Sequence, residues 1–250
     1  MSNVPSVDLD RVALLLDVDG TLLDFAPTPR EVFVPATLRE ALRCLFERTS
    51  GALALVSGRP IEELDLLFAP LQLPAAGGHG AEFRLSAVGE IRHGQAARLG
   101  KDLKRRLATI AGVAPGIILE DKEFSLAIHY RLAPEQEDTV REAVLAICEE
   151  AGPSIEVLPG KYVFEVKSAG FDKGTAVRHL MAHAPFRSRR PVFLGDDTTD
   201  EAAIGVMPEF DGVGISVGRV MAGAKGCFDA PQDVRTWLQG LARIERVAAE

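Results

Sequence analysis

Four short apolar runs constrain the fold of this 250-residue chain more than any other feature. Each run is apolar at nearly every position and ends in a polar or glycine-containing turn. Strands with one face in water alternate apolar and polar residues, whereas continuous apolar runs are typical of strands covered on both faces, as in a parallel sheet. The runs are VALLL before Asp17, ALALV before Ser57, PVFL before Gly195 and GVGISV before Gly218.

Segments with helical periodicity separate these runs. Apolar residues recur every three or four positions along each segment, as expected for helices with one buried face. The second segment opens with a proline, which suits the first position of a helix. Strands that alternate with helices predict a doubly wound, Rossmann-like α/β core with a parallel sheet. The predicted helices cover residues 36–48, 60–70, 173–182 and 232–244.

The middle of the chain has a different pattern. In chain order it predicts a helix at 96–111, two strands within 116–131 with a turn near Lys122, a helix at 135–152, and a hairpin within 154–167 that turns at Pro159–Gly160. This order indicates a small antiparallel sheet backed by two helices. We therefore expect an inserted α/β cap domain at 98–167, between the two parts of a core domain at 1–97 and 168–250.

The amino-acid composition limits the binding partners that the protein can have. The net charge of −8 argues against a nucleic-acid partner, because binding phosphate backbones requires a basic surface. A small phosphorylated substrate stays compatible, since a metal or a few cations can reverse the local field. The three cysteines lack metal-ligand spacing and are expected to be free thiols in a reducing compartment. The N-terminal apolar stretch is too short for a signal peptide or a membrane span, so we expect a soluble, cytoplasmic monomer with no membrane partner.

Two aspartates, Asp17 and Asp19, follow the first apolar run directly. Close carboxylates repel, so one must be protonated or a cation must lie between them, and Mg²⁺ prefers such oxygen ligands. An aspartate can also attack phosphorus to form an acyl-phosphate, while a second acid protonates the leaving oxygen and later deprotonates water. Gly20 permits a tight turn beside a ligand, and Thr21 offers a hydroxyl and an amide. The alternative is an acidic turn in solvent.

Other polar residues follow the remaining strands. Ligands of open α/β sheets bind beyond the carboxyl ends of the strands, so these residues are expected to share one site. Ser57 and the amides beside it, including that of Gly58, can hold phosphate oxygens; alternatively, Ser57 caps the helix that follows Pro60. Lys173 begins a predicted helix, where its charge opposes the helix dipole. It therefore predicts a compensating anion, the alternative being an exposed lysine.

The segment GDDTTDE adds three aspartates after the strand at PVFL: Asp196, Asp197 and Asp200. Thr198 and Glu201 have the spacing of a capping box, so part of this segment is expected to cap a helix. Capping does not explain the three aspartates as well. A cation site is therefore favoured over a solvated turn.

Four motifs in this order, DVDGT, SGR, DKG and GDDTTDE, resemble those of the haloacid dehalogenase superfamily of aspartate-nucleophile phosphatases. The insert is similar to the α/β cap of its sugar-phosphatase branch. LEDKEFSLAIHYR, GKYVFEV and GDDTTDE look like the trehalose-6-phosphate phosphatase family in particular. The resemblance covers nearly the whole chain.

This resemblance implies roles for the matching residues. Asp17 matches the nucleophile, and Asp19 matches the general acid/base with its backbone carbonyl on Mg²⁺. The implied metal ligands are Asp17, Asp19, Asp196 and Asp200, and the implied phosphate-binding residues are Thr21, Ser57, Gly58 and Lys173. We assign no firm role to Asp197, or to His79 and Glu82 of GGHGAEFR.

In the insert, side chains two residues apart share a sheet face. Glu120 and Lys122 are thus expected on one face, as are His129 and Arg131, while Ile118, Leu126 and Ile128, or their alternates, pack on the helices. The pattern alone favours a face exposed to solvent. The resemblance implies instead that this face closes over the core site and contacts the sugar. The implied substrate-binding residues are Arg59, Glu120, Lys122, Arg131 and Glu165.

The resulting hypothesis is a Mg²⁺-dependent phosphatase that hydrolyses trehalose 6-phosphate to trehalose and phosphate through an aspartyl-phosphate. The nearest alternative is another sugar-phosphate or sugar-acid phosphatase of the same superfamily, such as a sucrose-phosphate, glucosyl-phosphoglycerate or mannosyl-phosphoglycerate phosphatase. A receiver-like signalling module is a non-enzymatic alternative, disfavoured by Asp19 and the large insert. A carbon–halogen hydrolase is disfavoured by the carboxylates of the predicted metal site.

Overall fold

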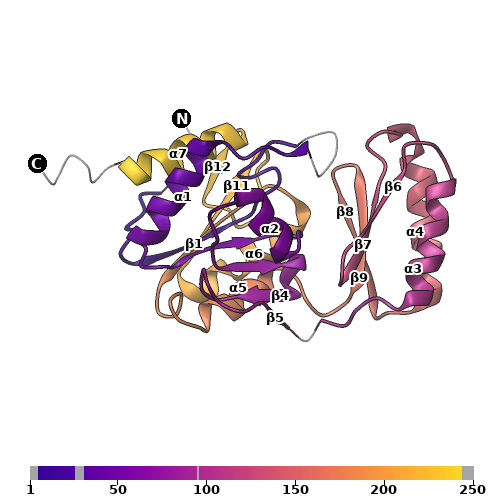
Figure 1. Ribbon diagram of the computed structural model, residues 1–250, viewed down its shortest axis with the longest axis horizontal. Coiled ribbons are helices and arrows are strands. Elements are labelled where there is room, and N and C mark those ends of the chain that lie inside the picture. The colour runs from indigo at the N-terminus through magenta and orange to yellow at the C-terminus, as the bar shows by residue number, and fades with distance from the viewer. Residues whose placement is uncertain (1–4, 26–30, 95, 244–250) are drawn as a thin grey trace, which may run out of the picture. The chain divides into compact units, whose positions relative to one another are not determined.

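The computed structural model describes residues 5–25, 31–94 and 96–243. The chain divides into two compact units (Figure 1). The core unit comprises Met1–His93 and Asp172–Glu250, and the inserted unit comprises Gly94–Phe171. The inserted unit thus begins before and ends after the predicted insert at 98–167.

An eight-stranded sheet forms the centre of the core unit. Neighbouring strands run parallel from β12 to β3, and β4 and β5 add an antiparallel edge. The four predicted runs are confirmed as strands and are almost completely buried. In spatial order the strands are β12 (Gly226–Phe228), β11 (Val213–Val217), β10 (Arg190–Gly195), β1 (Val12–Leu16), β2 (Leu53–Val56), β3 (Ala75–Gly77), β4 (Glu82–Arg84) and β5 (Arg92–His93).

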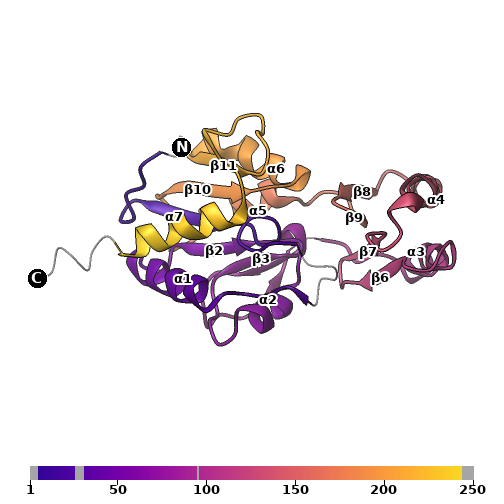
Figure 2. The same cartoon turned by 90° about the horizontal axis from the view of Figure 1, so that it is seen from above.

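Helices cover both faces of this sheet (Figures 1 and 2). Side chains of a strand alternate between faces, so Leu14 and Leu16 of β1 pack in one cluster and Ala13 and Leu15 in the other. The predicted doubly wound α/β core is therefore confirmed. The first face carries α1 (Ala36–Arg48), α2 (Ile61–Phe68) and α7 (Pro231–Arg243), and the second carries α5 (Lys173–Met181) and α6 (Thr198–Val206).

The inserted unit is a four-stranded antiparallel sheet with two helices on one face (Figure 1). Leu126 and Ile128 of β7, one of the two inner strands, pack with Leu107, Val140 and Val144 of the helices. The predicted order of helix, two strands, helix and two strands is confirmed. The elements are α3 (Lys101–Ala108), β6 (Ile118–Asp121), β7 (Ser125–His129), α4 (Glu137–Ala151), β8 (Ile155–Gly160) and β9 (Val163–Ser168).

Two details of the insert differ from the sequence prediction. Leu119, not Ile118, packs on the helices, because Leu119 lies opposite the buried Ile128 in the register. Ile118 shares the face of Glu120 and is 38% exposed. The β8–β9 hairpin turns after Gly160, which pairs directly with Val163.

Short 3₁₀ turns complete the fold: η2 (Gly78–Gly80), η3 (Thr109–Gly112), η4 (Pro134–Gln136) and η5 (Met207–Phe210). Over the described ranges, every helix is too short or too polar to cross a bilayer.

Candidate active site

Three adjacent strands deliver the predicted core residues to one edge of the sheet. Asp17 follows β1, Ser57 follows β2 and Asp196 follows β10, and β1 lies between the other two. The pairing of β1 with β10 continues to Asp17, because the Asp17 amide donates a hydrogen bond to Leu194 O at 3.0 Å. The loop after Asp17 closes on itself, with the Gly20 amide 2.8 Å from Leu23 O.

Lys173 is the buried cation of this edge. Its Nζ donates to Asp17 Oδ1 at 2.7 Å and to Asp200 Oδ1 at 2.6 Å, and only 3% of Lys173 is exposed. Burial alone lowers the pKa of this lysine, but the charges of the two carboxylates outweigh it, so the pKa is raised and the ammonium stays charged. The compensating anion predicted for Lys173 is therefore confirmed as two carboxylates.

Asp200 and Asp197 organise the turn that leads into α6. Asp200 Oδ2 accepts from the amides of Asp196 and Asp197, each at 3.0 Å. Asp197 is the N-cap, and its Oδ1 accepts from the Thr198 amide at 2.7 Å. The predicted capping box of Thr198 and Glu201 is therefore wrong by one residue. Aspartate caps at least as well as threonine, and Asp200 occupies the N3 position facing the buried site.

Three carboxylates form a cluster beside Lys173. Oxygens of Asp17, Asp196 and Asp200 lie within 4.8 Å of one another. Burial, and then the Asp200 charge, raise the pKa of Asp17 to about 7 against the opposing effect of Lys173. Burial, and then the Asp17 charge, raise the pKa of Asp196 to about 9. One lysine thus leaves excess negative charge here, and the oxygen donors fit a hard divalent cation.

Gly20 allows the loop after β1 to approach this cluster. Its φ of +83° is in the left-handed region, and a Cβ at this position would lie 2.1 Å from Asp196 Oδ2. Both conditions require glycine. The neighbouring Thr21, predicted to bind phosphate, donates from Oγ1 to Asp196 Oδ1 at 3.3 Å.

Asp19 has a different partner from Asp17. Arg59 donates from Nε to Asp19 Oδ2 at 2.6 Å and from a terminal nitrogen to Oδ1 at 2.7 Å. This bidentate pair fixes the orientation of the carboxylate. The sequence motifs placed Arg59 among the substrate-binding residues and gave no sign of this pair.

Ser57 is buried at the end of β2, with 1% exposed, and its Oγ accepts from the Arg59 amide at 3.1 Å. The alternative prediction that Ser57 caps α2 is wrong, because the N-cap is Pro60. The cap comes instead from Glu82 of β4, whose Oε2 accepts from the Ile61 amide at 2.9 Å. Sequence reasoning missed this role of Glu82. The signal was the lack of a capping side chain before Ile61, which indicates a distant acceptor without identifying it.

His79 packs against the SGR loop. A Cβ on Gly58 would lie 2.5 Å from His79 Nε2, so the predicted phosphate-binding loop needs glycine here. His79 itself is buried and has a φ of 57° within η2. No local sequence pattern predicts that His79 packs against this loop.

The inserted unit collects most of its predicted substrate-binding residues on one sheet face. Glu120 Oε2 lies 2.8 Å from His129 Nε2, and Lys122 Nζ lies 3.2 Å from Glu165 Oε2. Arg131 follows the end of β7, and its guanidinium stacks 6.0 Å from the centre of the Tyr162 ring.

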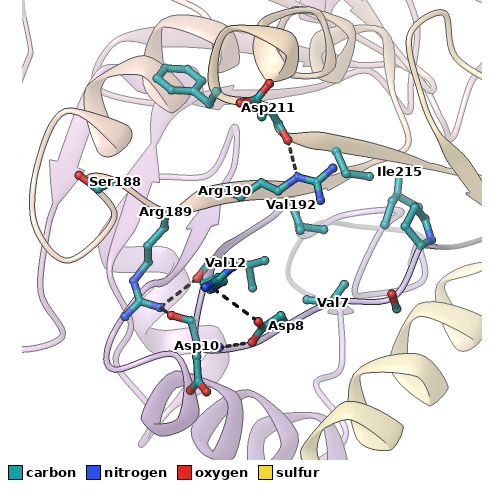
Figure 3. Close-up of a pocket in the computed structure, with 15 residues that line it drawn as sticks. Val7, Asp8, Asp10, Val12, Ser188, Arg189, Arg190, Val192, Asp211 and Ile215 are labelled. Atoms are coloured by element: carbon teal, nitrogen blue, oxygen red, sulfur yellow. Dashed lines mark hydrogen bonds and ion pairs between the residues drawn. The ribbon is translucent and has the colours of Figure 1, made fainter.

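A separate cavity of about 730 Å³ lies at the opposite, amino ends of β1, β10 and β11 (Figure 3). Arg189 donates to the carbonyls of Asp10 and Val12 there, and Arg190 donates to the carbonyl of Asp211. None of the predicted site residues is among the described residues that line it. Arg189 thus ties the N-terminal segment to the sheet, and Arg190 ties the turn before β11 to it.

Comparison with known proteins decides the family. The sequence pattern of the family described as trehalose-phosphatase matches residues 15–229. The chain belongs to the trehalose-phosphatase family. It is 39% identical over 213 residues to a probable trehalose-phosphate phosphatase of Sinorhizobium fredii, which covers 85% of this chain and 80% of that protein. It is 38% identical over 230 residues to the trehalose-6-phosphate phosphatase of Escherichia coli, covering 92% and 86%.

Solved structures agree on the fold of this trehalose-phosphatase family member. The C-terminal domain of the C. albicans trehalose-6-phosphate phosphatase superposes with a TM-score of 0.81 at 22% identity, over 93% of this chain and 92% of that domain. A haloalkanoate (HAD) superfamily phosphatase of Bacteroides thetaiotaomicron gives a TM-score of 0.60 at 18% identity, over 98% and 97%. The expected haloacid dehalogenase fold is confirmed.

Proposed function

We propose that this chain is a Mg²⁺-dependent phosphatase that hydrolyses trehalose 6-phosphate to trehalose and phosphate. The observation that carries the proposal is the buried cluster of Asp17, Asp196 and Asp200 against Lys173, at the sheet edge where ligands of this fold class bind. The names of the related proteins support the choice of substrate.

Mg²⁺ would be held by the carboxylates of Asp17 and Asp196, with the Asp19 carbonyl and Asp200 as further ligands. The charge excess that raises the pKa values of Asp17 and Asp196 supports this set. When bound, the ion supplies positive charge that offsets repulsion between the phosphate and the acids. Asp200 also fixes the metal-site turn, because its oxygens already accept from Lys173 and two amides.

Asp17 is the proposed nucleophile. Its oxygen attacks phosphorus, the bond from phosphorus to the sugar oxygen breaks, and an aspartyl-phosphate remains. Lys173 offsets charge on the nucleophile and on the transferring group. The Ser57 hydroxyl and the amides of Gly58 and Thr21 are proposed to hold the phosphoryl oxygens.

Asp19 is the proposed general acid and base. It donates a proton to the departing sugar oxygen and then takes a proton from the water that attacks the aspartyl-phosphate. The two hydrogen bonds from Arg59 orient the Asp19 carboxyl group beside the proposed site. Arg59 is therefore better supported as the partner of Asp19 than as a direct ligand of the sugar.

The polar face of the inserted unit is proposed to recognise the sugar. Glu120 and Glu165 offer acceptors for sugar hydroxyls, and Lys122 and Arg131 offer donors. A site built from such groups discriminates strongly, because a sugar that lacks a matching hydroxyl leaves a polar group unpaired.

Phosphate release from three sugar phosphates tests this function. We expect kcat/KM to be highest for trehalose 6-phosphate, well above the values for glucose 6-phosphate and sucrose 6-phosphate. Activity should stop with a chelator and return with Mg²⁺. Equal or higher kcat/KM for another sugar phosphate would overturn the substrate assignment. Full activity in the chelator would overturn the metal dependence.

A further inference from the structure

Two side chains of β7 hold the acidic groups on the polar face of the inserted unit. Ser125 contacts Glu165, and His129 contacts Glu120. We propose that Ser125 and His129 are positioning residues for sugar recognition, which fix the carboxylates of Glu165 and Glu120 in the orientation that accepts sugar hydroxyls. This inference rests on the proposed function, in which that face binds the sugar.

Ser125 and Lys122 hold Glu165 from two sides. The Ser125 hydroxyl donates to Oε1 at 2.5 Å, and Lys122 Nζ lies 3.2 Å from Oε2. On β7, the residue directly opposite Glu165 in the register is Ala127, whose small side chain leaves room for both donors. A carboxylate has about four acceptor positions, so a Glu165 fixed by two donors can still accept from a ligand.

His129 holds Glu120 in its accepting form. Its Nε2 lies 2.8 Å from Glu120 Oε2. Burial raises the pKa of Glu120, but the hydrogen bond from His129 and the charge of Lys122 outweigh burial and leave that pKa lower than usual. Glu120 is therefore ionised and oriented at neutral pH.

The burial of this network argues for more than a solvated sheet face. The side chains of Lys122 and Glu165 are each only 11% exposed, and 3% of Ser125 is exposed. Removing charges from water costs free energy that a simple ion pair often fails to regain. A nearby charged pair, Lys167 with Glu156, is separate: Lys167 lies opposite Ser125 in the register but bonds to Glu156 at 2.6 Å.

Steady-state kinetics of Ser125→Ala and His129→Leu test the proposal with two substrates. Each variant loses one hydrogen bond that orients a glutamate carboxylate. We expect this loss to raise KM for trehalose 6-phosphate by about three- to tenfold. Turnover of p-nitrophenyl phosphate, which has no sugar hydroxyls, should stay within about twofold of wild type. Ser125→Thr keeps the hydroxyl and His129→Gln keeps a donor at the position of Nε2, so each should restore most of the KM.

Thr139→Ala is the matched control, because it removes an exposed hydroxyl from the same unit and should change neither substrate. An unchanged KM for trehalose 6-phosphate in both variants would overturn the proposal. An equal loss of activity toward p-nitrophenyl phosphate would also overturn it, because that result would indicate a merely structural role. If Ser125→Ala fails to fold, His129→Leu and its Gln counterpart decide.

The substrate panel distinguishes failure of the positioning proposal from failure of the proposed function. If wild type prefers a different sugar phosphate, the function is wrong, and the variants are assayed on that preferred substrate. If wild type prefers trehalose 6-phosphate and the variants keep its KM, only the positioning roles are wrong.

Discussion

Lys173 combines two unfavourable placements at the scale of one residue. A cation at the first turn of a helix is opposed by the helix dipole, and its ammonium is almost completely buried. Asp17 and Asp200 compensate both costs, since each accepts a hydrogen bond from Nζ. The lysine therefore stays charged beside the proposed nucleophile, where an ordinary surface lysine would be screened by water.

Replacing Asp17 with Asn should remove the nucleophile while keeping its size. We expect phosphate release to fall by roughly 10⁴-fold or more, with an unchanged circular dichroism spectrum. Asp138→Asn, an exposed acid of α4, is the control and should keep wild-type activity. Turnover of the Asp17 variant near the wild-type rate would refute its assignment as nucleophile.

Replacing Gly20 with Ala should disrupt the metal site without changing any charge. The added Cβ meets the Asp196 carboxylate, and the positive φ is strained in alanine by about 1 kcal/mol. We expect weaker Mg²⁺ activation, seen as a higher Mg²⁺ concentration at half-maximal activity. Gly100→Ala places a methyl group in open space and provides the comparison. Equal Mg²⁺ dependence of the two variants would contradict this account of Gly20.

Helix α2 depends for its N-terminal cap on a residue of another element, strand β4. Its N-terminus has no local side-chain cap, so the Glu82 carboxylate of β4 accepts the Ile61 amide instead. Because this carboxylate also carries negative charge to the positive end of the helix dipole, it suits the position twice. The packing of β4 against α2 thus helps to hold the SGR loop that precedes the helix.

Replacing Glu82 with Ala should lower the free energy of unfolding by about 1–2 kcal/mol, the usual effect of losing a cap. Glu82→Gln should lose less, because its amide oxygen still accepts. Urea denaturation measures both, and Glu90→Ala, at an exposed position nearby, is the control. Equal stabilities of the Glu82→Ala and Glu90→Ala proteins would show that the cap contributes nothing.

The acidic cluster links the pH and metal dependence of stability at the scale of the whole molecule. Folding raises the pKa of Asp17 from 3.8 to about 7 and that of Asp196 from 3.8 to about 9. A group with a raised folded pKa contributes stability that is fully present below its unfolded pKa and is lost as the pH rises through the folded value. The metal-free protein should therefore lose stability from about pH 4 to pH 9.

Thermal unfolding with and without Mg²⁺ checks this expectation. In chelator, Tm should fall from pH 5 to pH 9, and Mg²⁺ should raise Tm more at pH 9 than at pH 5 because it binds ionised carboxylates. Asp196→Asn should flatten the chelator profile and reduce the Mg²⁺ effect, whereas Asp138→Asn should match wild type. An Asp196→Asn profile that follows wild type in both conditions would count against the cluster as the metal site.

Sequence patterns determined the layers of both units. Unbroken apolar runs such as VALLL can only be covered on both faces, and the period of the apolar residues in 36–48 fits only a helix. The position of Asp17 directly after a buried strand likewise determined its edge of the sheet. These are local properties, so they can be read from neighbouring residues.

Only the tertiary structure decided which donor each acid binds. Arg59 lies 40 residues from Asp19, and Ile61 lies 21 residues from Glu82, and no local pattern links either pair. The same holds for Ser125 with Glu165, also 40 residues apart. A hydrogen bond depends on sub-ångström placement of two side chains, and that placement arises from the packing of whole strands and helices rather than from the sequence near either residue.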